Sequence, residues 1–266
     1  LELRDRTGSI AARVFREADR LGLGFERGDV VAVRGRVEQF RGQLSAELED
    51  VRKVDPERVD PAEFLPVAYR DPEELAGFLE HLAREVPPPG YRAVVERLLL
   101  APGPLGPAAV EVAAEFRRAP CTRAGHHAYL GGLIEHTVAV GTLVTETCVL
   151  HPRLNSDLLM AAALIHDVGK TGEFTYGAEI GLSDRGRALG HLQLGAELIN
   201  AAADAVRAAG ADLPAEDRDA LLACVMCHHG TDALRLRAFP SPEAIALYRL
   251  NALDAQVKTA LEHGIG

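Results

Sequence analysis

Cysteine is scarce in this 266-residue sequence, and lysine is scarcer still. Four cysteines, Cys121, Cys148, Cys224 and Cys227, are few for a chain of this length and do not form the pattern of a disulfide framework. No apolar run reaches about 18 residues, so no transmembrane helix is expected. Nor does the chain open with a charged segment followed by an apolar one, as a signal peptide does. These absences predict a cytoplasmic protein without a membrane partner.

Positive charge is also in short supply, and it is unevenly distributed. The formal net charge of −10 argues against unspecific binding of polyanions by the whole surface. Residues 1–54 hold 11 Lys/Arg and 10 Asp/Glu, whereas the remainder holds 18 and 29. Almost all of these cations are arginines, which bind phosphate and stack on bases better than lysines do. Only the N-terminal part is therefore expected to offer a basic face.

Residues 1–54 alternate apolar and polar side chains in the way that β-strands do. Ile10, Ala12 and Val14 follow a turn signal, and the Arg-Gly-Gln triplet at 41–43 predicts a hairpin between two further alternating runs. Several short strands at close spacing predict a small β-barrel. The strings LELRDRTGSIAARVF and GDVVAVRGRVEQFRGQLSAELEDVRKV resemble the OB-fold of the anticodon-binding type. Because Leu1 opens within a predicted strand, we expect this OB-fold to be partial, without its first strand.

An OB-fold binds single strands with arginines along the backbone and aromatic rings under the bases. The resemblance therefore implies substrate contacts for one set of residues in this region, with the alternative that the aromatic ring caps the barrel and the cations are solvated. These candidates are Arg34, Arg36, Phe40, Arg41 and Lys53.

The pattern changes after residue 54. Prolines mark a linker, and helical periodicity begins after Asp71-Pro72. We assign residues 55–105 to a linker and helical connection, and residues 106–266 to a domain that reads as helical throughout. The predicted fold class is thus α+β and multidomain, with a partial β-barrel followed by an all-α bundle.

One stretch dominates the helical part. Residues 158–165 are all apolar, and they lead directly into His166 and Asp167, with Lys170 three residues later. Burying that run would carry an imidazole and a carboxylate inward, which is costly unless something compensates them. A bound metal ion is the obvious compensation.

Further polar residues interrupt apolar helical patterns elsewhere in this part. A lone histidine of this kind is more often a hydrogen-bonded core residue than a ligand. Several such sites in one domain, however, are not expected by coincidence. Separate helices of a bundle can aim such side chains at one interior point. Imidazole and carboxylate together suit Mn, Fe, Zn or Co, and a set of this size has room for one or two divalent ions. The additional candidates are His136, His191, His228, His229 and Asp254.

The order of these residues resembles a known superfamily. His136, then His166-Asp167, then Asp254 matches the HD-domain metal-dependent phosphohydrolases, and Lys170 matches the lysine of HDxxK. More narrowly, HHAYLGGLIEHTVAV, LLMAAALIHDVGK, CHHG and LYRLNALDAQVK resemble the YhaM family of 3′-to-5′ exoribonucleases, which are built as an OB-fold followed by an HD domain.

The resemblance implies roles for the matched residues. One metal, with Mn²⁺ the first expectation, would be held by four ligands and a second by three more, with Asp167 able to bridge. Metal-activated water would then attack the phosphorus, and Lys170 would stabilise the developing charge, unless it is a surface lysine. The sequence leaves open which of His228 and His229 is a ligand. The ligands are His136, His166, Asp167 and Asp254 for the first metal, and His191, His228 and His229 for the second.

Two adjacent histidines, His126 and His127, also match the family. They are expected either to line the substrate cleft or to be structural. A second motif, CxxCH at residues 224–228, fits the rule for haem attachment, but it lies in an apolar helical run, so its cysteines are expected in the core.

The function predicted from these features is 3′-to-5′ trimming of single-stranded RNA, with single-stranded DNA as a further partner. Two alternatives stay open: hydrolysis of small nucleotides such as dNTPs, ppGpp or cyclic nucleotides, and a non-catalytic nucleic-acid-binding regulator. The sequence is also compatible with a homo-oligomer.

Overall fold

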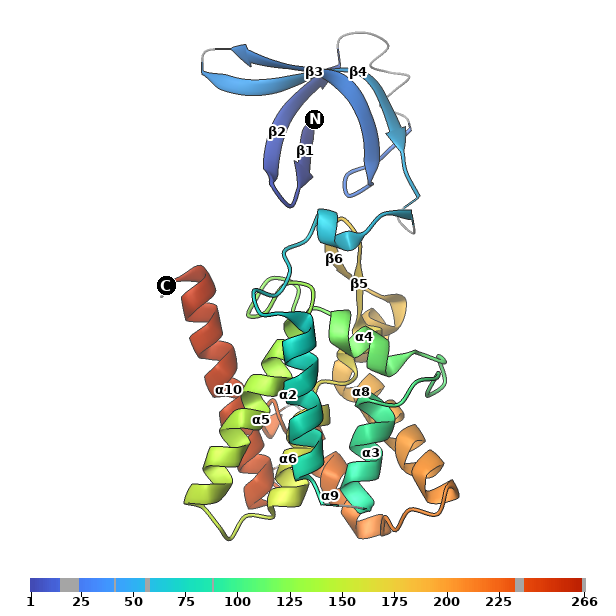
Figure 1. The fold of residues 1–266 in the computed structure, drawn as a ribbon, viewed down its shortest axis with the longest axis vertical. Coiled ribbons are helices and arrows are strands. Elements are labelled where there is room, and N and C mark those ends of the chain that lie inside the picture. The colour runs from blue at the N-terminus through green and yellow to red at the C-terminus, as the bar shows by residue number, and fades with distance from the viewer. Residues whose placement is uncertain (15–23, 41, 56–57, 88, 233–236, 265–266) are drawn as a thin grey trace. The chain divides into compact units, whose positions relative to one another are not determined.

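The structure is a computed structural model, and it describes residues 1–14, 24–40, 42–55, 58–87, 89–232 and 237–264 (Figure 1). The chain divides into two compact units. A first unit comprises Leu1–Val67 with Tyr176–Gly181, and a helical unit comprises Ala68–Thr175 with Leu182–Gly266. A strand-rich unit followed by a helical one confirms the predicted α+β class.

The first unit is built on one mixed sheet. Its strands lie in the order β1-β2-β4-β3, with β1 antiparallel to β2, β2 parallel to β4, and β4 antiparallel to β3. The predicted turn before the second strand is present, because Asp5 Oδ1 accepts the backbone N–H of Thr7 at 2.7 Å. The strands are β1 (Glu2–Asp5), β2 (Gly8–Val14), β3 (Val31–Phe40) and β4 (Gln43–Lys53), and a 3₁₀ turn, η2 (Pro61–Glu63), follows them.

Alternation along these strands builds the core of the first unit. Ala12, Ala46, Leu48 and Val51 are buried together on one face of the sheet. Among the strands that the structure describes, β1 and β3 pair on one side only, so the sheet is open and the predicted barrel is not closed by them. The hairpin between β3 and β4 is present, although Arg41 in its turn lies outside the described residues.

The helical unit contains α2 (Pro72–Glu85), α3 (Gly90–Leu99), α4 (Val112–Arg118), α5 (Gly132–Leu150), α6 (Ser156–Ile165), α7 (Lys170–Glu173), α8 (Asp184–Ala208), α9 (Ala215–Met226) and α10 (Pro242–His263). Capping side chains set several of the starts: Asp71, Asn155, Ser183 and Ser241 each accept a backbone N–H of the following first turn. The apolar run 158–165 lies in α6, where every one of its residues is buried. Contacts with α2, α3, α5, α9 and α10 make α6 the centre of this unit.

Helix α5 is the other long apolar element, and by length and composition alone it could cross a membrane. The sequence predicted no such segment. However, the core helix of a soluble protein passes the same test, and 44% of the tested window is buried inside this unit. Helix α5 also carries buried Glu135 and His136 and packs against α2, α4, α6 and α10. Its apolar character therefore serves the bundle core.

Two expectations about residues 55–266 are modified by the structure. The connection predicted over 55–105 is divided, because α2 and α3 pack on α5, α6 and α8 and group with the helical unit. The expectation of helix throughout the rest is wrong at one place, where β5 (Phe174–Tyr176) and β6 (Ile180–Leu182) form a two-stranded hairpin. Three-residue strands carry too little periodicity to be recognised in a sequence.

Candidate metal centre

The centre begins where α6 ends. His166 caps the helix, and the chain then turns tightly, with the N–H of Val168 donating to Ile165 O and that of Lys170 donating to Asp167 O. Gly169 lets this turn lie directly against α8, because a Cβ there would lie 2.0 Å from the backbone oxygen of His191. The turn therefore presents His166 and Asp167 at the end of a buried helix and against α8.

A first group of ligand atoms comes from α5 and this turn. His136 and His166 are at most 1% exposed, and their Nε2 atoms face each other at 3.2 Å. Asp167 Oδ2 lies 3.7 Å from His136 Nε2 and 3.3 Å from His166 Nε2. Two imidazoles and a carboxylate thus converge on one point.

Protein acceptors fix which ring nitrogens carry protons in this group. His166 Nδ1 donates to Ala163 O at 2.8 Å, and His136 Nδ1 donates to the Asp254 carboxylate at 2.6 Å. Burial lowers the pKa of His136, so its ring holds a single proton. With Nδ1 protonated in both rings, the two facing Nε2 atoms present lone pairs, as metal-ligating histidines do.

A second group lies on the other side of the same carboxylate. His191 is the first residue beyond a kink in α8 at Gly190, where φ is +68°. Its Nε2 lies 2.9 Å from His229 Nε2 and 3.8 Å from Asp167 Oδ1, and His228 Nε2 lies 3.4 Å from that oxygen. The ligand atoms of these four residues are all within 4.8 Å of one another.

Both His228 and His229 reach this group, although a helix would point them apart. Helix α9 ends at Met226, and the two rings, with centroids 4.1 Å apart, lie in the turn that follows it. His228 Nδ1 donates to Val225 O at 2.6 Å, which again leaves Nε2 as a lone pair toward the site. The sequence left open which of the two is a ligand, because the direction of each ring depends on where the helix ends.

The chemistry of the donor set fits a divalent cation. Asp167 Oδ1 and His228 Nε2 are buried side-chain atoms with no hydrogen-bond partner among the described residues. Both are acceptors, and they face further acceptors. Unpaired buried acceptors are costly, whereas a cation would satisfy several of them at once. Among the clusters of described residues that could hold a metal, these two groups are joined through Asp167.

Asp254 lies outside both groups, and it forms a further cluster with His127 and His136 whose ligand atoms lie within 4.8 Å of one another. Its Oδ2 accepts from His136 Nδ1 at 2.6 Å and contacts His127 Nε2 at 3.0 Å. Burial alone would raise the pKa of Asp254, but these two contacts outweigh it and hold the pKa below its ordinary value. The direct metal-ligand role implied for Asp254 by the family resemblance stays a prediction.

Lys170 is 5% exposed, so it is no surface lysine. Its Nζ lies 2.6 Å from Asp167 Oδ2. Burial would raise the pKa of Asp167, but Lys170 and the neighbouring histidines lower it well below the ordinary value. Lys170 therefore keeps Asp167 ionised, and its predicted role toward a phosphate stays a prediction.

Comparison with known families agrees with this geometry. Residues 133–256 match the family model of the HD domain, and residues 1–54 match that of the OB-fold nucleic acid binding domain. Along the chain, an OB-fold is therefore followed by an HD domain. HD domains bind divalent metals, which is the chemistry indicated by the clustered lone pairs.

Several bacterial proteins match almost the full chain. Proteins named 3′-5′ exoribonuclease YhaM from Listeria welshimeri, Bacillus subtilis and Oceanobacillus iheyensis are 24%, 25% and 26% identical to it. Each match covers 97% of this chain and 77–78% of the relative. No solved structure matches the chain significantly.

The adjacent histidines His126 and His127 differ in their burial and in their contacts. His127 is 1% exposed, and both of its ring nitrogens contact protein groups, Asp254 and the Tyr129 hydroxyl. His126 is less buried, and its Nδ1 is a buried atom with no partner among the described residues. His126 also groups with Cys121 and His136, with ligand atoms within 4.8 Å of one another. A substrate contact stays a prediction for both histidines.

In the OB-fold, the predicted substrate-binding cations are on the surface and paired with carboxylates. Arg34 and Arg36 lie 3.7 and 3.9 Å from Glu49, and Lys53 lies 2.8 Å from Asp29. Exposed pairs of this kind contribute little to stability, so a phosphate could compete for these cations. Phe40 ends β3, and its side chain, like Arg41, lies outside what the structure describes. Nucleic-acid contacts by this set stay a prediction.

Sequence reasoning missed several side chains that hold the ligands. Asn251 donates its amide N–H to His228 O, and this leaves its Oδ1, 2.9 Å from His136 Nε2, as one more acceptor facing the first group. Glu173 Oε1 lies 3.3 Å from His191 Nδ1. Asn251 was discoverable, because it precedes Asp254 by three residues on the same helix, whereas nothing in the sequence links Glu173 to His191. Cys224 and Cys227 are buried in the core, as expected.

The buried histidines predict that metal-free protein loses stability in mild acid. Burial lowers the pKa of His228 and of His126 from 6.5 to about 3. Between these values the unfolded chain binds protons that the folded chain does not, so stability falls as pH drops below 6.5. Calorimetry of metal-stripped protein should show that the unfolding temperature falls when the pH is lowered from 7 to 5. His228→Gln should flatten that fall and exposed His151→Gln should not; equal slopes in all three proteins would contradict the assignment.

Proposed function

We propose that this protein is a metal-dependent 3′-to-5′ exoribonuclease that trims single-stranded RNA, and that it also accepts single-stranded DNA. One observation carries the proposal: two groups of ligand atoms share Asp167 inside an HD domain. Two metal ions about 3.5–4 Å apart are a recurrent device for hydrolysing phosphodiesters. The OB-fold supplies a second support, since that fold binds single strands, and the relatives are named as exoribonucleases.

Each of the two ions would be held by its own set of residues, with Asp167 common to both. His136, His166 and Asp167 would hold one ion, with Asp254 as the fourth ligand that the family resemblance implies, and Asp167, His191, His228 and His229 would hold the other. When bound, such ions supply an activated water and neutralise charge on the phosphate. Mn²⁺ is our first choice, and Fe, Co or Zn also suit the nitrogen and oxygen ligands.

Backbone groups and Lys170 preorganise this centre. Ala163 O and Val225 O hold protons on the Nδ1 atoms of His166 and His228, so the opposite nitrogens face the site without having to lose a proton. Lys170 Nζ lies 2.6 Å from Asp167, the carboxylate that both groups share, and beside the ions it would stabilise negative charge on a phosphate.

A 5′-labelled oligoribonucleotide incubated with the protein and Mn²⁺ should give a ladder of products shortened from the 3′ end. A circular RNA of the same sequence has no 3′ end and should survive. His166→Gln should slow trimming by at least about 100-fold, because even residues that only orient a ligand are worth 10–100-fold. His151→Gln, at an exposed histidine beyond the end of α5, is the matched control.

Other outcomes would point elsewhere. Cleavage of the circle at a comparable rate would indicate an endonuclease. Faster turnover of dNTPs, ppGpp or cyclic nucleotides than of RNA would favour the small-nucleotide hydrolase. Binding of RNA without turnover, with the metal sites loaded, would favour a regulator.

A further inference from the structure

His127 is held in a backbone conformation that a histidine rarely adopts. Its φ is +52°, in the left-handed region, which only a few per cent of non-glycine residues occupy and which is costly unless the surroundings hold it. The N–H of Cys121 donates to His127 O at 3.0 Å, and the N–H of His127 donates to Glu262 at 3.2 Å. Gly132 leaves room for this carbonyl, since a Cβ there would lie 2.1 Å from it.

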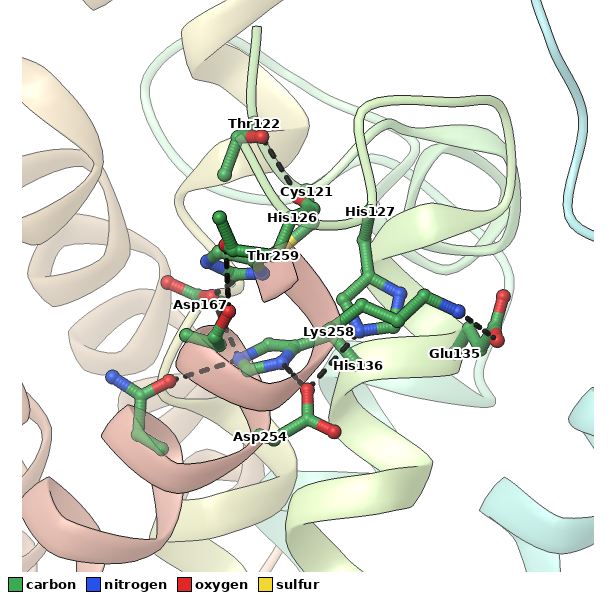
Figure 2. A network of polar contacts seen from close by, with 12 residues as sticks. Cys121, Thr122, His126, His127, Glu135, His136, Asp167, Asp254, Lys258 and Thr259 are labelled. Atoms are coloured by element: carbon green, nitrogen blue, oxygen red, sulfur yellow. Dashed lines mark hydrogen bonds and ion pairs between the residues drawn. The ribbon is translucent and has the colours of Figure 1, made fainter. Parts of the chain in front are cut away.

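This backbone aims the buried ring at two polar partners. His127 Nε2 lies 3.0 Å from Asp254 Oδ2, and Nδ1 lies 2.9 Å from the Tyr129 hydroxyl. That hydroxyl donates to Glu135, whose other oxygen accepts from Lys258 at 3.0 Å. Figure 2 shows His127 and His136 approaching Asp254 together. The ring of His127 is therefore held by a chain of contacts that ends at a surface-accessible lysine.

The contact with Asp254 connects His127 to the metal centre. Asp254 Oδ2 is the atom that accepts from His136 Nδ1. A carboxylate oxygen held from two sides cannot rotate freely, so it fixes both the tautomer and the direction of the His136 ring. The opposite nitrogen of that ring, Nε2, is the one that faces His166 and Asp167.

We infer that His127 is a positioning residue: through Asp254 it orients His136 toward the metal. Its strained backbone would then be retained because no other conformation brings Nε2 to that oxygen. The catalytic part of this inference rests on the proposed function, but the effect on metal binding does not.

Glutamine and asparagine separate this role from simple space filling. The amide nitrogen of His127→Gln can reach the position of Nε2 and donate to Asp254, whereas that of His127→Asn reaches only the position of Nδ1. Asparagine, however, tolerates a left-handed backbone better than glutamine does. A purely structural residue should therefore prefer Asn, and a positioning residue should prefer Gln.

We expect His127→Asn to weaken Mn²⁺ binding and to lower kcat by about 10–100-fold, the usual effect of losing a residue that orients a metal ligand. KM for the RNA should be unchanged. His127→Gln should recover most of both losses. Mn²⁺ affinity, measured by calorimetry on each purified protein, is the primary readout, and the unfolding midpoint of each metal-free variant is recorded beside it.

Two results would overturn the inference. One is equal Mn²⁺ affinity in the Asn and Gln variants. The other is a higher Mn²⁺ affinity in whichever variant has the higher unfolding midpoint, even if that variant is His127→Asn. If the protein proved not to trim RNA, the Mn²⁺ affinities would still decide the role of His127.

Discussion

Replacing Asp167 with asparagine is expected to abolish activity, with a loss of more than about 100-fold, and to remove metal binding at both groups. The reason is that the two oxygens of this carboxylate serve different groups. Oδ2 lies beside His136 and His166, whereas Oδ1 lies beside His191 and His228. The amide has a similar shape but carries no charge, and its nitrogen has no lone pair to offer a cation. Equilibrium Mn²⁺ binding and the labelled-RNA assay measure the two losses.

The same substitution should also destabilise the metal-free protein, because it leaves the buried ammonium of Lys170 without its counter-charge. Breaking a buried ion pair from one side costs about 3–5 kcal/mol. Adding Lys170→Met removes the orphaned charge, so the double variant should regain much of the stability and none of the metal binding. Denaturant unfolding of the parent, Asp167→Asn, Lys170→Met and the double variant tests this cycle. A single Asp167→Asn variant as stable as the parent would show that the ion pair does not contribute as described.

Replacing Gly169 with alanine is the second change with a large expected effect. The added Cβ would lie 2.0 Å from His191 O and 2.5 Å from Gly195 N, both backbone atoms of α8. The turn and α8 must then separate, which carries His191 away from Asp167. Overpacking of this kind costs about 1–3 kcal/mol, and we expect trimming to fall by at least about 100-fold because a ligand is displaced.

The short helix α7 contains the matched control for this variant. At Gly172 an added Cβ would meet only Leu194 Cδ1 at 3.8 Å, an ordinary contact. Gly172→Ala should therefore leave trimming unchanged and leave stability unchanged or slightly raised, since alanine favours helix over glycine. The unfolding midpoint, Mn²⁺ affinity and trimming rate of both variants should be compared. Similar losses in the two variants would mean that an added methyl group anywhere in this turn is harmful, and that the close approach at Gly169 is not the cause.

Much of the fold follows from local patterns. Alternation at Ile10, Ala12 and Val14 predicts β2, and the capping residue Asp71 before Pro72 predicts the start of α2. These signals are local because hydrogen bonds within a few residues decide them. The hairpin β5–β6 was not recognised, since its strands have three residues each.

In the candidate site, too, the sequence predicts some features and leaves others to the packing. The types of its residues and their order along the chain could be predicted, because a histidine or carboxylate stands out within an apolar helical pattern. Lys170 was left between a surface and a catalytic role, and only packing places its ammonium beside Asp167. His228 and His229 could not be told apart, because their common direction depends on α9 ending at Met226.

The sequence by itself therefore determined the class of chemistry: imidazole and carboxylate ligands in a helical domain that follows a strand-rich one along the chain. The tertiary structure decided how those ligands are used. It turned the Nε2 lone pairs inward, put Asp167 between two groups, and placed His127 and Asp254 behind His136. The physical reason is distance along the chain, since His136 and Asp254 are 118 residues apart and meet only through packing of α5 against α10. No local periodicity records which ring nitrogen such a meeting selects.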